Sequence, residues 1–234
     1  MRLAGIAIAV GLTLSPCSSV EAASDLIFTK TDYPDFIMRR SRPFRESQIL
    51  TAALLSSSDI PQVKAYREFL DKKVRHLPKA EQLAALNSYV NRHVKQTTDY
   101  ELYLRDDVWA TPVNTLVIGG DCEDIALAKR WGLNRLGYSE ADIYLVIGVT
   151  LTTTPPTGHA VLAVRLSAND VRVLDSLQSV ILRPDEAPFE PAYGLNMFGF
   201  WRVDTPGHAG GDYNQRALER ALARQKDSDH DRNP

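Results

Sequence analysis

Apolar residues in the first half of the chain recur three or four positions apart, between charged and polar residues. This spacing places apolar side chains on one face of a helix and polar ones on the other. The helices predicted from it span residues 45–57, 61–76 and 79–97. Pro61 suits the first turn of the second helix. The segments 24–43 and 98–118 are expected to form an irregular lead-in and a loop.

A fourth helical pattern follows two glycines. Asp121 is a natural N-cap, Asp124 is placed as in a capping box, and Gly137 stands where the helix would end. We therefore predict a helix from Asp121 to about Leu136. Cys122 lies in its first turn.

From Ile143 onward the pattern is typical of strands. Residues 143–149 form a continuous β-prone run, as expected of a central strand. Residues 159–166 and 171–175 form a predicted hairpin. The remaining expectations are loops at 152–157 and 184–191, a last strand at 193–203, a short helix at 213–225, and a polar, disordered tail over 226–234.

The N-terminus is expected to be a targeting segment rather than part of the fold. Arg2 supplies a positive charge, residues 3–14 are almost unbroken in apolar character, and small residues follow near Ala22. This pattern predicts a secretory signal peptide over residues 1–22, too short in its apolar part to span a bilayer. We expect an exported protein with a single domain over residues 23–225.

Composition narrows the possible chemistry. A formal net charge of −2, with both signs interspersed, gives no indication of nucleic-acid binding or of an anionic membrane surface. Cys17 belongs to the predicted signal peptide, and Pro16 before it disfavours a lipoprotein signal. The exported chain keeps Cys122 alone, which excludes an intramolecular disulfide and a multi-cysteine zinc site. A lone thiol in an exported protein is a candidate reactive group.

Cys122 is therefore the first candidate for catalysis. At a helix start the unpaired backbone N–H groups and the helix dipole favour thiolate over thiol. The alternative is that the cysteine is a small buried hydrophobic residue. Three neighbouring acids make this a poor place to bury one, so we favour catalysis. A thiol nucleophile needs a base and a third group that orients the base.

His159 and Asp175 are the candidates for these two roles, and the hairpin provides a geometric test. If Leu166 pairs with Asp170 across a three-residue loop, Asp175 lies opposite Val161, diagonal to His159 on the same face. A four-residue loop would separate the two faces, so the prediction requires an odd loop or a bulge. Taken singly, His159 also suits a hydrogen-bonded strand residue, and Asp175 a capping acid at a strand end.

Together these motifs resemble a known family. They are similar to motifs of the bacterial transglutaminase-like cysteine proteinases, in particular the LapG-type periplasmic adhesin proteases. The motifs are Gly-Gly-Asp-Cys-Glu-Asp before a helix, then Gly-His-Ala-Val-Leu and Leu-Asp-Ser. The resemblance runs from about residue 83 to 201. It implies an α+β papain/transglutaminase-like domain with N-terminal helices and a nucleophile helix packed on an antiparallel β-sheet. It also implies that Cys122 is the nucleophile, His159 the general base and acid, and Asp175 its orienter.

The resemblance further implies Ca²⁺, with Asp121 and Glu123 as matching ligands. A physical argument agrees, because carboxylates beside Cys122 raise the pKa of its thiol and a bound Ca²⁺ would neutralise them. Two side chains fall short of the roughly six to eight oxygens that Ca²⁺ takes, so backbone carbonyls and water are expected to complete the site. The alternative is that Asp121 only caps the helix and Glu123 faces solvent.

Two further residues are weighed for the site. Trp109 is a candidate to supply an oxyanion donor or to shape the cleft, together with the backbone N–H of Cys122. A buried Trp109 that anchors its loop fits the sequence equally well. His208 is a rival base, but no acid follows it at a useful spacing, and we interpret it as a loop histidine.

The expected function is Ca²⁺-dependent cleavage, in the periplasm, of a large biofilm adhesin near its N-terminus, which releases the adhesin from the outer membrane. The resemblance implies a LapD-like inner-membrane cyclic-di-GMP receptor that sequesters the protease. Two alternatives stay open. The same Cys-His-Asp triad would serve an acyl-transferring transglutaminase or a cell-wall peptide hydrolase, and the fold would also serve a non-catalytic, calcium-responsive binding module.

Overall fold

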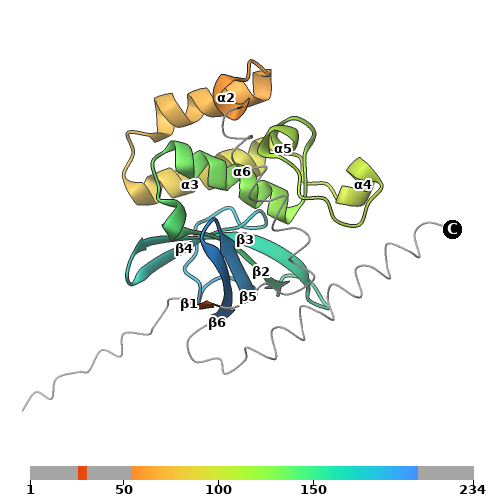
Figure 1. The fold of residues 1–234 in the computed structure, drawn as a ribbon, viewed down its shortest axis with the longest axis vertical. Helices are drawn as coiled ribbons and strands as arrows, with labels where there is room; N and C mark the ends of the chain where they lie inside the picture. The colour runs from red at the N-terminus through yellow and green to blue at the C-terminus, as the bar shows by residue number, and fades with distance from the viewer. Residues whose placement is uncertain (1–25, 31–53, 205–234) are drawn as a thin grey trace, which may run out of the picture.

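The computed structural model describes residues 26–30 and 54–204, in which helices cover one face of a β-sheet (Figure 1). Of the first predicted helix, residues 54–57 are helical. The predictions that lie outside the described residues are the signal peptide, the rest of the 45–57 helix, the lead-in beyond residue 30, His208, the 213–225 helix, the tail, and with them both ends of the domain.

The helices predicted at 61–76 and 79–97 are present, with shorter bounds. α2 (Pro61–Phe69) continues as a π-helical segment, η1 (Leu70–Val74), and α3 spans Lys79–His93. The fully buried apolar residues follow the predicted spacing: Val63, Tyr66, Leu70, Val74, Leu83, Leu86 and Val90. The amphipathic pattern therefore identified the face that packs on the core.

The segment 98–118, predicted to be a loop, contains two short helices instead. α4 (Asp99–Tyr103) begins with a capping box between Thr98 and Glu101, and α5 (Pro112–Ile118) begins with Thr111 as its N-cap. These caps satisfy backbone N–H groups that a helix start leaves unpaired. The loop prediction was wrong because it weighed the polar composition of the segment above these local start signals.

The helix that carries the cysteine is confirmed as α6 (Cys122–Arg135). It packs against α3, α5 and the sheet strand β3 (Thr157–Ser167), so it lies between the other helices and the sheet (Figure 1). Every residue from Asp124 to Leu133 is buried, including Lys129 and Arg130. The central position of α6 explains why its pattern is less one-sided than that of a surface helix.

All neighbouring strands of the six-stranded sheet are antiparallel, in the order β1-β6-β5-β2-β3-β4. The other strands are β1 (Ile27–Lys30), β2 (Ile143–Thr150), β4 (Asp170–Leu174), β5 (Phe189–Asn196) and β6 (Gly199–Asp204), and a 3-10 turn, η2 (Glu140–Asp142), precedes β2. The main core fills the space between helices and sheet, and a smaller apolar cluster lies on the other face.

Two strand predictions need correction. The single strand expected at 193–203 is a hairpin, in which Asn196 Oδ1 accepts a hydrogen bond from the N–H of Phe198 at 2.8 Å and turns the chain. β5 also begins at Phe189, inside the expected loop 184–191. β1 lies in the expected lead-in and forms only by pairing with β6, which local sequence does not reveal. None of the helices in the described ranges is long and apolar enough to cross a membrane.

Candidate active site

Two glycines fix where α6 begins. Gly119 has a φ of 101°, and a Cβ there would collide with the carbonyl oxygen of Lys95. A Cβ on Gly120 would lie 2.5 Å from Asp124 Oδ2. The N–H of Gly120 donates to the Lys95 carbonyl and its own carbonyl accepts from the N–H of Thr97, each at 3.1 Å. These bonds tie the start of α6 to the segment that follows α3.

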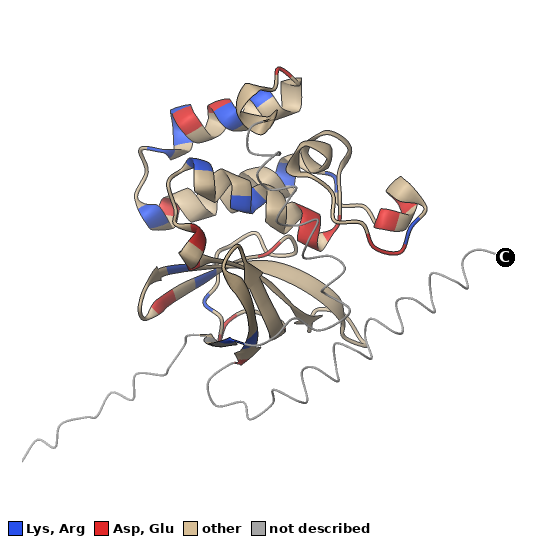
Figure 2. Cartoon of the chain, in the orientation of Figure 1, with Lys and Arg blue, Asp and Glu red and all other residues tan. Residues whose placement is uncertain are grey.

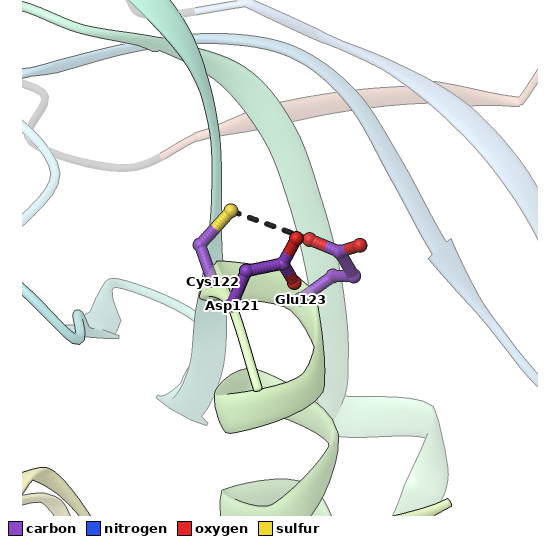
Figure 3. A group of neighbouring side chains, drawn as sticks. All are labelled: Asp121, Cys122 and Glu123. Atoms are coloured by element: carbon purple, nitrogen blue, oxygen red, sulfur yellow. Dashed lines mark hydrogen bonds between the residues drawn. The ribbon is translucent and has the colours of Figure 1, made fainter. Parts of the chain in front are cut away.

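Cys122 is the first residue of α6 and donates a hydrogen bond from its thiol to Glu123 Oε2 at 3.3 Å (Figure 3). Burial raises the pKa of the thiol well above its usual value, and the charges of Glu123 and Asp121 raise it further. The nearby backbone N–H of Ala160 has the opposite effect. In the chain alone, burial and two carboxylates therefore outweigh the helix dipole that was expected to favour thiolate.

The capping box predicted for α6 does not form. Asp121 occupies the N-cap position, but its side chain makes no capping hydrogen bond. Asp124 is fully buried, and its Oδ1 accepts a hydrogen bond from the backbone N–H of Ala110 at 2.7 Å. A tertiary contact with the segment before α5 thus replaces the local one.

His159 on β3 and Asp175 just after β4 meet as predicted. His159 Nε2 lies 2.7 Å from Asp175 Oδ1, and both side chains are buried. Burial acts to raise the pKa of Asp175, but the hydrogen bond and charge of His159 and the N–H of Leu177 lower it more, so the net shift is downward. Asp175 is therefore an ionised acceptor that holds the histidine ring from one side.

The register of the hairpin explains this contact. Along the strands the paired residues are those predicted, from Arg165 with Val171 to Leu162 with Leu174. Only the tip differs, because Ser167 pairs with Asp170 and a bulge before it absorbs the extra residue. The bulge was one of the two arrangements that the prediction required.

The packing of α6 against β3 brings Cys122 toward the same place. Ala160, beside His159 on β3, has its N–H close enough to the sulfur to lower the thiol pKa. His159 also lowers the pKa of Asp121 through its charge, although burial of Asp121 raises that pKa overall. The first turn of α6, which carries Cys122, therefore lies beside the strand that carries His159.

Acidic residues lie on α4, on the loop after it and at the start of α6 (Figure 2), and five of their carboxylates form groups that could hold a metal ion. They form three overlapping groups, each with ligand atoms within 4.8 Å of one another: Asp121 with Cys122 and Glu123, Asp99 with Asp107 and Glu123, and Asp99 with Asp121 and Asp124. Asp121 and Glu123 were predicted as metal ligands from the sequence, whereas Asp99, Asp107 and Asp124 were not. For Asp99 and Asp107 the signal was the acidic character of the 98–118 segment, which had no assigned position in space, whereas Asp124 had been assigned to the capping box.

The carboxylate cluster, which we define as Asp99, Asp107, Asp121, Glu123 and Asp124, has the chemistry of a Ca²⁺ site. Burial raises the pKa of Asp124 to about 8 and that of Glu123 well above its usual value, and neighbouring acids raise both further. Asp121 Oδ1 and Asp124 Oδ2 are buried and accept no hydrogen bond from the described residues. Hard carboxylate oxygens suit Ca²⁺, and a cation would relieve their mutual repulsion.

Trp109 lies beside this cluster rather than in an identified oxyanion site. The N–H of the preceding Val108 donates to Asp99 Oδ2, and that of the following Ala110 donates to Asp124. The indole packs against the main core. An anchoring role therefore fits what is observed, and a role in the oxyanion site or the cleft stays a prediction.

Comparisons with known proteins identify similar structures and a matching family. A solved structure of EGTA-treated Legionella pneumophila LapG has 27% identity and a TM-score of 0.55 over 75% of this chain and 95% of that chain. The calcium-bound form of Legionella pneumophila LapG has 26% identity and a TM-score of 0.54 over 75% and 97%. No protein in a search of curated sequences matches significantly. The family profile described as bacterial transglutaminase-like cysteine proteinase matches residues 66–192, more than half of the chain, so the chain belongs to that family.

Proposed function

We propose that this cysteine proteinase is a Ca²⁺-dependent endopeptidase with Cys122 as nucleophile, His159 as general base and acid, and Asp175 as the residue that orients His159. The observation that carries the proposal is the buried His159–Asp175 contact of 2.7 Å beside the helix that begins with Cys122. All three residues fall within the part of the chain that the family profile matches.

The His159–Asp175 contact supports a separate role for each ring nitrogen of His159. Nε2 is held by Asp175, so Nδ1 is the nitrogen that exchanges a proton with the Cys122 thiol. The sulfur attacks the peptide carbonyl and forms a thioester, while His159 returns the proton to the leaving amine. His159 then takes a proton from water as the water oxygen attacks the thioester carbonyl carbon. The carbon–sulfur bond breaks, the carboxylic acid product is released, and His159 returns the proton to the Cys122 sulfur. The N–H of Cys122 is the proposed oxyanion donor, with Trp109 at the wall of the cleft.

The carboxylate cluster would hold Ca²⁺ through Asp121 and Glu123, with Asp99, Asp107 and Asp124 around them. Bound there, Ca²⁺ would supply the positive charge that neutralises the carboxylates raising the thiol pKa. Glu123 accepts the thiol hydrogen bond in the present arrangement, so the Cys122 proton must turn from Glu123 to His159 before it is transferred. The solved calcium-bound and EGTA-treated forms of Legionella LapG support a role for this ion.

We further propose that the substrate is a large cell-surface adhesin cleaved near its N-terminus in the periplasm, and that a LapD-like inner-membrane cyclic-di-GMP receptor sequesters the enzyme. The likeness to LapG and the sequence of residues 1–22 support this setting. Fractionation of cells that express the full chain or a chain lacking residues 1–22 tests the location. Loss of periplasmic protein in the shortened chain is expected, and equal amounts would contradict the export proposal.

The central experiment incubates the purified protein with an N-terminal fragment of a repeat adhesin from the source organism. We expect one cleavage with Ca²⁺, none with Cys122→Ala, and none in EGTA until excess Ca²⁺ is restored. Addition of a fluorescent primary amine separates the alternatives, because a transglutaminase would attach the amine to the fragment. Amine attachment without cleavage would replace the protease proposal, and unchanged cleavage by Cys122→Ala would refute it.

A pull-down with the periplasmic domain of the candidate receptor tests sequestration separately. The receptor is expected to retain the wild-type protein and Cys122→Ala equally, because binding does not require the thiol. Failure of the receptor to reduce adhesin cleavage when present in excess would contradict the proposed control, and would leave the peptidase assignment intact.

A further inference from the structure

Lys129 is a buried lysine that the catalytic steps above do not use. Its side chain is fully buried in α6, and its Nζ makes no hydrogen bond within the described residues. Burial of an ammonium group without hydrogen bonds is costly, so stability alone does not account for this lysine. The neighbouring Arg130 differs, because it is paired with Glu140 at 2.5 Å.

The position of Lys129 points to the catalytic residues. It lies seven residues after Cys122, which places it on the same face of α6 and about 10 Å further along the axis. Asp175 is the anion that acts on it: the charge of Asp175 raises the Lys129 pKa and that of Lys129 lowers the Asp175 pKa. Lys129 is therefore coupled to the carboxylate that holds His159.

The other groups that α2 and α3 contribute near this part of α6 are uncharged, so Asp175 is the anion that acts on Lys129. From α2, the Tyr66 hydroxyl donates to the Ala128 carbonyl at 3.0 Å, and burial raises its pKa well above the usual value, so it stays neutral. α3 contributes two uncharged residues near Asp175: Asn91 donates to the Asp175 and Gln178 carbonyls at 2.9 and 3.0 Å, and Asn87 donates to Gln178 at 3.0 Å. β3 contributes His159 itself.

A buried carboxylate beside a histidine favours the protonated ring, whereas a general base must be neutral before it acts. A cation near the carboxylate offsets part of its negative charge and so makes protonation of the histidine less favourable. We propose that Lys129 is a positioning residue that acts through Asp175, keeping His159 neutral and ready to accept the Cys122 proton. This inference rests on the proposed function for its catalytic consequence, but the coupling of Lys129 to Asp175 and His159 stands separately.

The protonation of Lys129 fits this role. Burial lowers its pKa to about 7, against the partial opposing effect of Asp175. Below about pH 7 the residue therefore carries the charge that opposes protonation of His159, and above it the residue is mostly neutral. Its influence is expected in the acidic range, where a histidine would otherwise gain a proton.

The first test is an NMR titration of the histidine ring protons in the Ca²⁺-loaded protein, with His159 assigned by loss of its signal in His159→Gln. In Lys129→Met the His159 pKa is expected to rise by roughly half a pH unit or more. Lys72→Met, which removes an exposed lysine paired with Glu68, is the matched control and should leave the His159 titration unchanged. A His159 titration in Lys129→Met that coincides with wild type would overturn the proposal.

The second test measures acylation of Cys122 by p-nitrophenyl acetate, which needs no knowledge of the natural substrate. The rate for Lys129→Met is expected to fall about threefold near pH 6 and to approach wild type near pH 8.5, with no loss of melting temperature. An equal loss at every pH together with a lower melting temperature would indicate a structural role instead. If wild type shows no acylation that depends on Cys122, the proposed function fails, and the NMR titration still tests Lys129.

The third test covers the case in which Lys129→Met does not fold. In protein with isotope-labelled lysine side chains, Lys129 is expected to titrate near its lowered pKa, and Asp175→Asn should lower that pKa further because the favourable anion is lost. An unchanged Lys129 pKa in folded Asp175→Asn would refute the coupling.

Discussion

The His159–Asp175 pair and the carboxylate cluster lie at the same end of α6, but the pKa values of their carboxyl groups are shifted in opposite directions. In the pair, a carboxylate meets a histidine and a backbone N–H, and its pKa is lowered. In the cluster, carboxylates meet other carboxylates, and the pKa values of Asp124 and Glu123 are raised. The partners of the pair lie within the chain, whereas the cluster is proposed to bind a cation that would favour its ionised form. Cys122 begins α6 beside the cluster, and burial together with the charges of Glu123 and Asp121 raises the pKa of its thiol.

The largest effect is expected from breaking the complete pair. His159→Ala should lower the rate of Cys122 acylation by about 10³-fold or more, because the thiol loses its proton acceptor. The burst of p-nitrophenol from p-nitrophenyl acetate measures this change, and calorimetry in Ca²⁺ should still show a cooperative transition. A rate within tenfold of wild type would mean that another group acts as the base.

The next effect is expected from supplying the cluster with its cation. Ca²⁺ at about 100 times its dissociation constant would stabilise the fold by about 2.7 kcal/mol, which corresponds to roughly 5–10 °C in melting temperature for a chain of this size. EGTA should reverse the shift. Asp121→Asn should show a smaller shift, and a shift as large as that of wild type would place the ion elsewhere.

The two regions also differ in the sign of their pH dependence. Asp124 has a raised folded pKa of about 8, so in EGTA the folded state binds a proton that the unfolded state lacks, and stability should fall as pH rises from about 5 to 8. Asp175 has a lowered pKa, so its contribution is present above its ordinary pKa and is lost as pH falls below about 4.

Melting temperatures measured across this pH range, with and without Ca²⁺, separate the two contributions. Ca²⁺ should flatten the slope between about pH 5 and 8, because it binds the ionised carboxylates, and should leave the loss in acid largely unchanged. A slope between pH 5 and 8 that is independent of Ca²⁺ would contradict the proposed metal site.

The smallest effect is expected from removing the Asn91 hydrogen bonds that hold the segment around Asp175. Asn91→Ala removes the side-chain hydrogen bonds to the carbonyls of Asp175 and Gln178 and should cost about 1–2 kcal/mol of folding free energy. Urea unfolding measures it. Ser88→Ala, on the same helix, is the control and should change stability little. Equal stability of Asn91→Ala and wild type would show that the Asp175 segment is held by other contacts.

Much of the complete pair could be predicted because it depends on local regularities. The alternation of side chains along two short strands placed His159 and Asp175 on one face, and the observed bulge preserves that register. Helical spacing and two glycines likewise identified the start of α6. The predicted capping box does not form although its residues are present, and the Asp124 side chain accepts a hydrogen bond from the N–H of Ala110 in the folded core.

The carboxylate cluster could not be predicted from local sequence patterns, because its members come from distant segments. Asp99 and Asp107 lie more than a dozen residues before Asp121, and only the packing of α4 and the following loop against α6 brings them together. The coupling of Lys129 to Asp175 likewise joins a helix to the end of a strand. The sequence by itself determined the start of the helix that carries Cys122 and the strand register that brings His159 to Asp175, because these follow from short-range periodicity. Tertiary structure alone decided which carboxylates converge and that Lys129 is buried where the charge of Asp175 acts on it, because burial and charge proximity depend on contacts between distant segments.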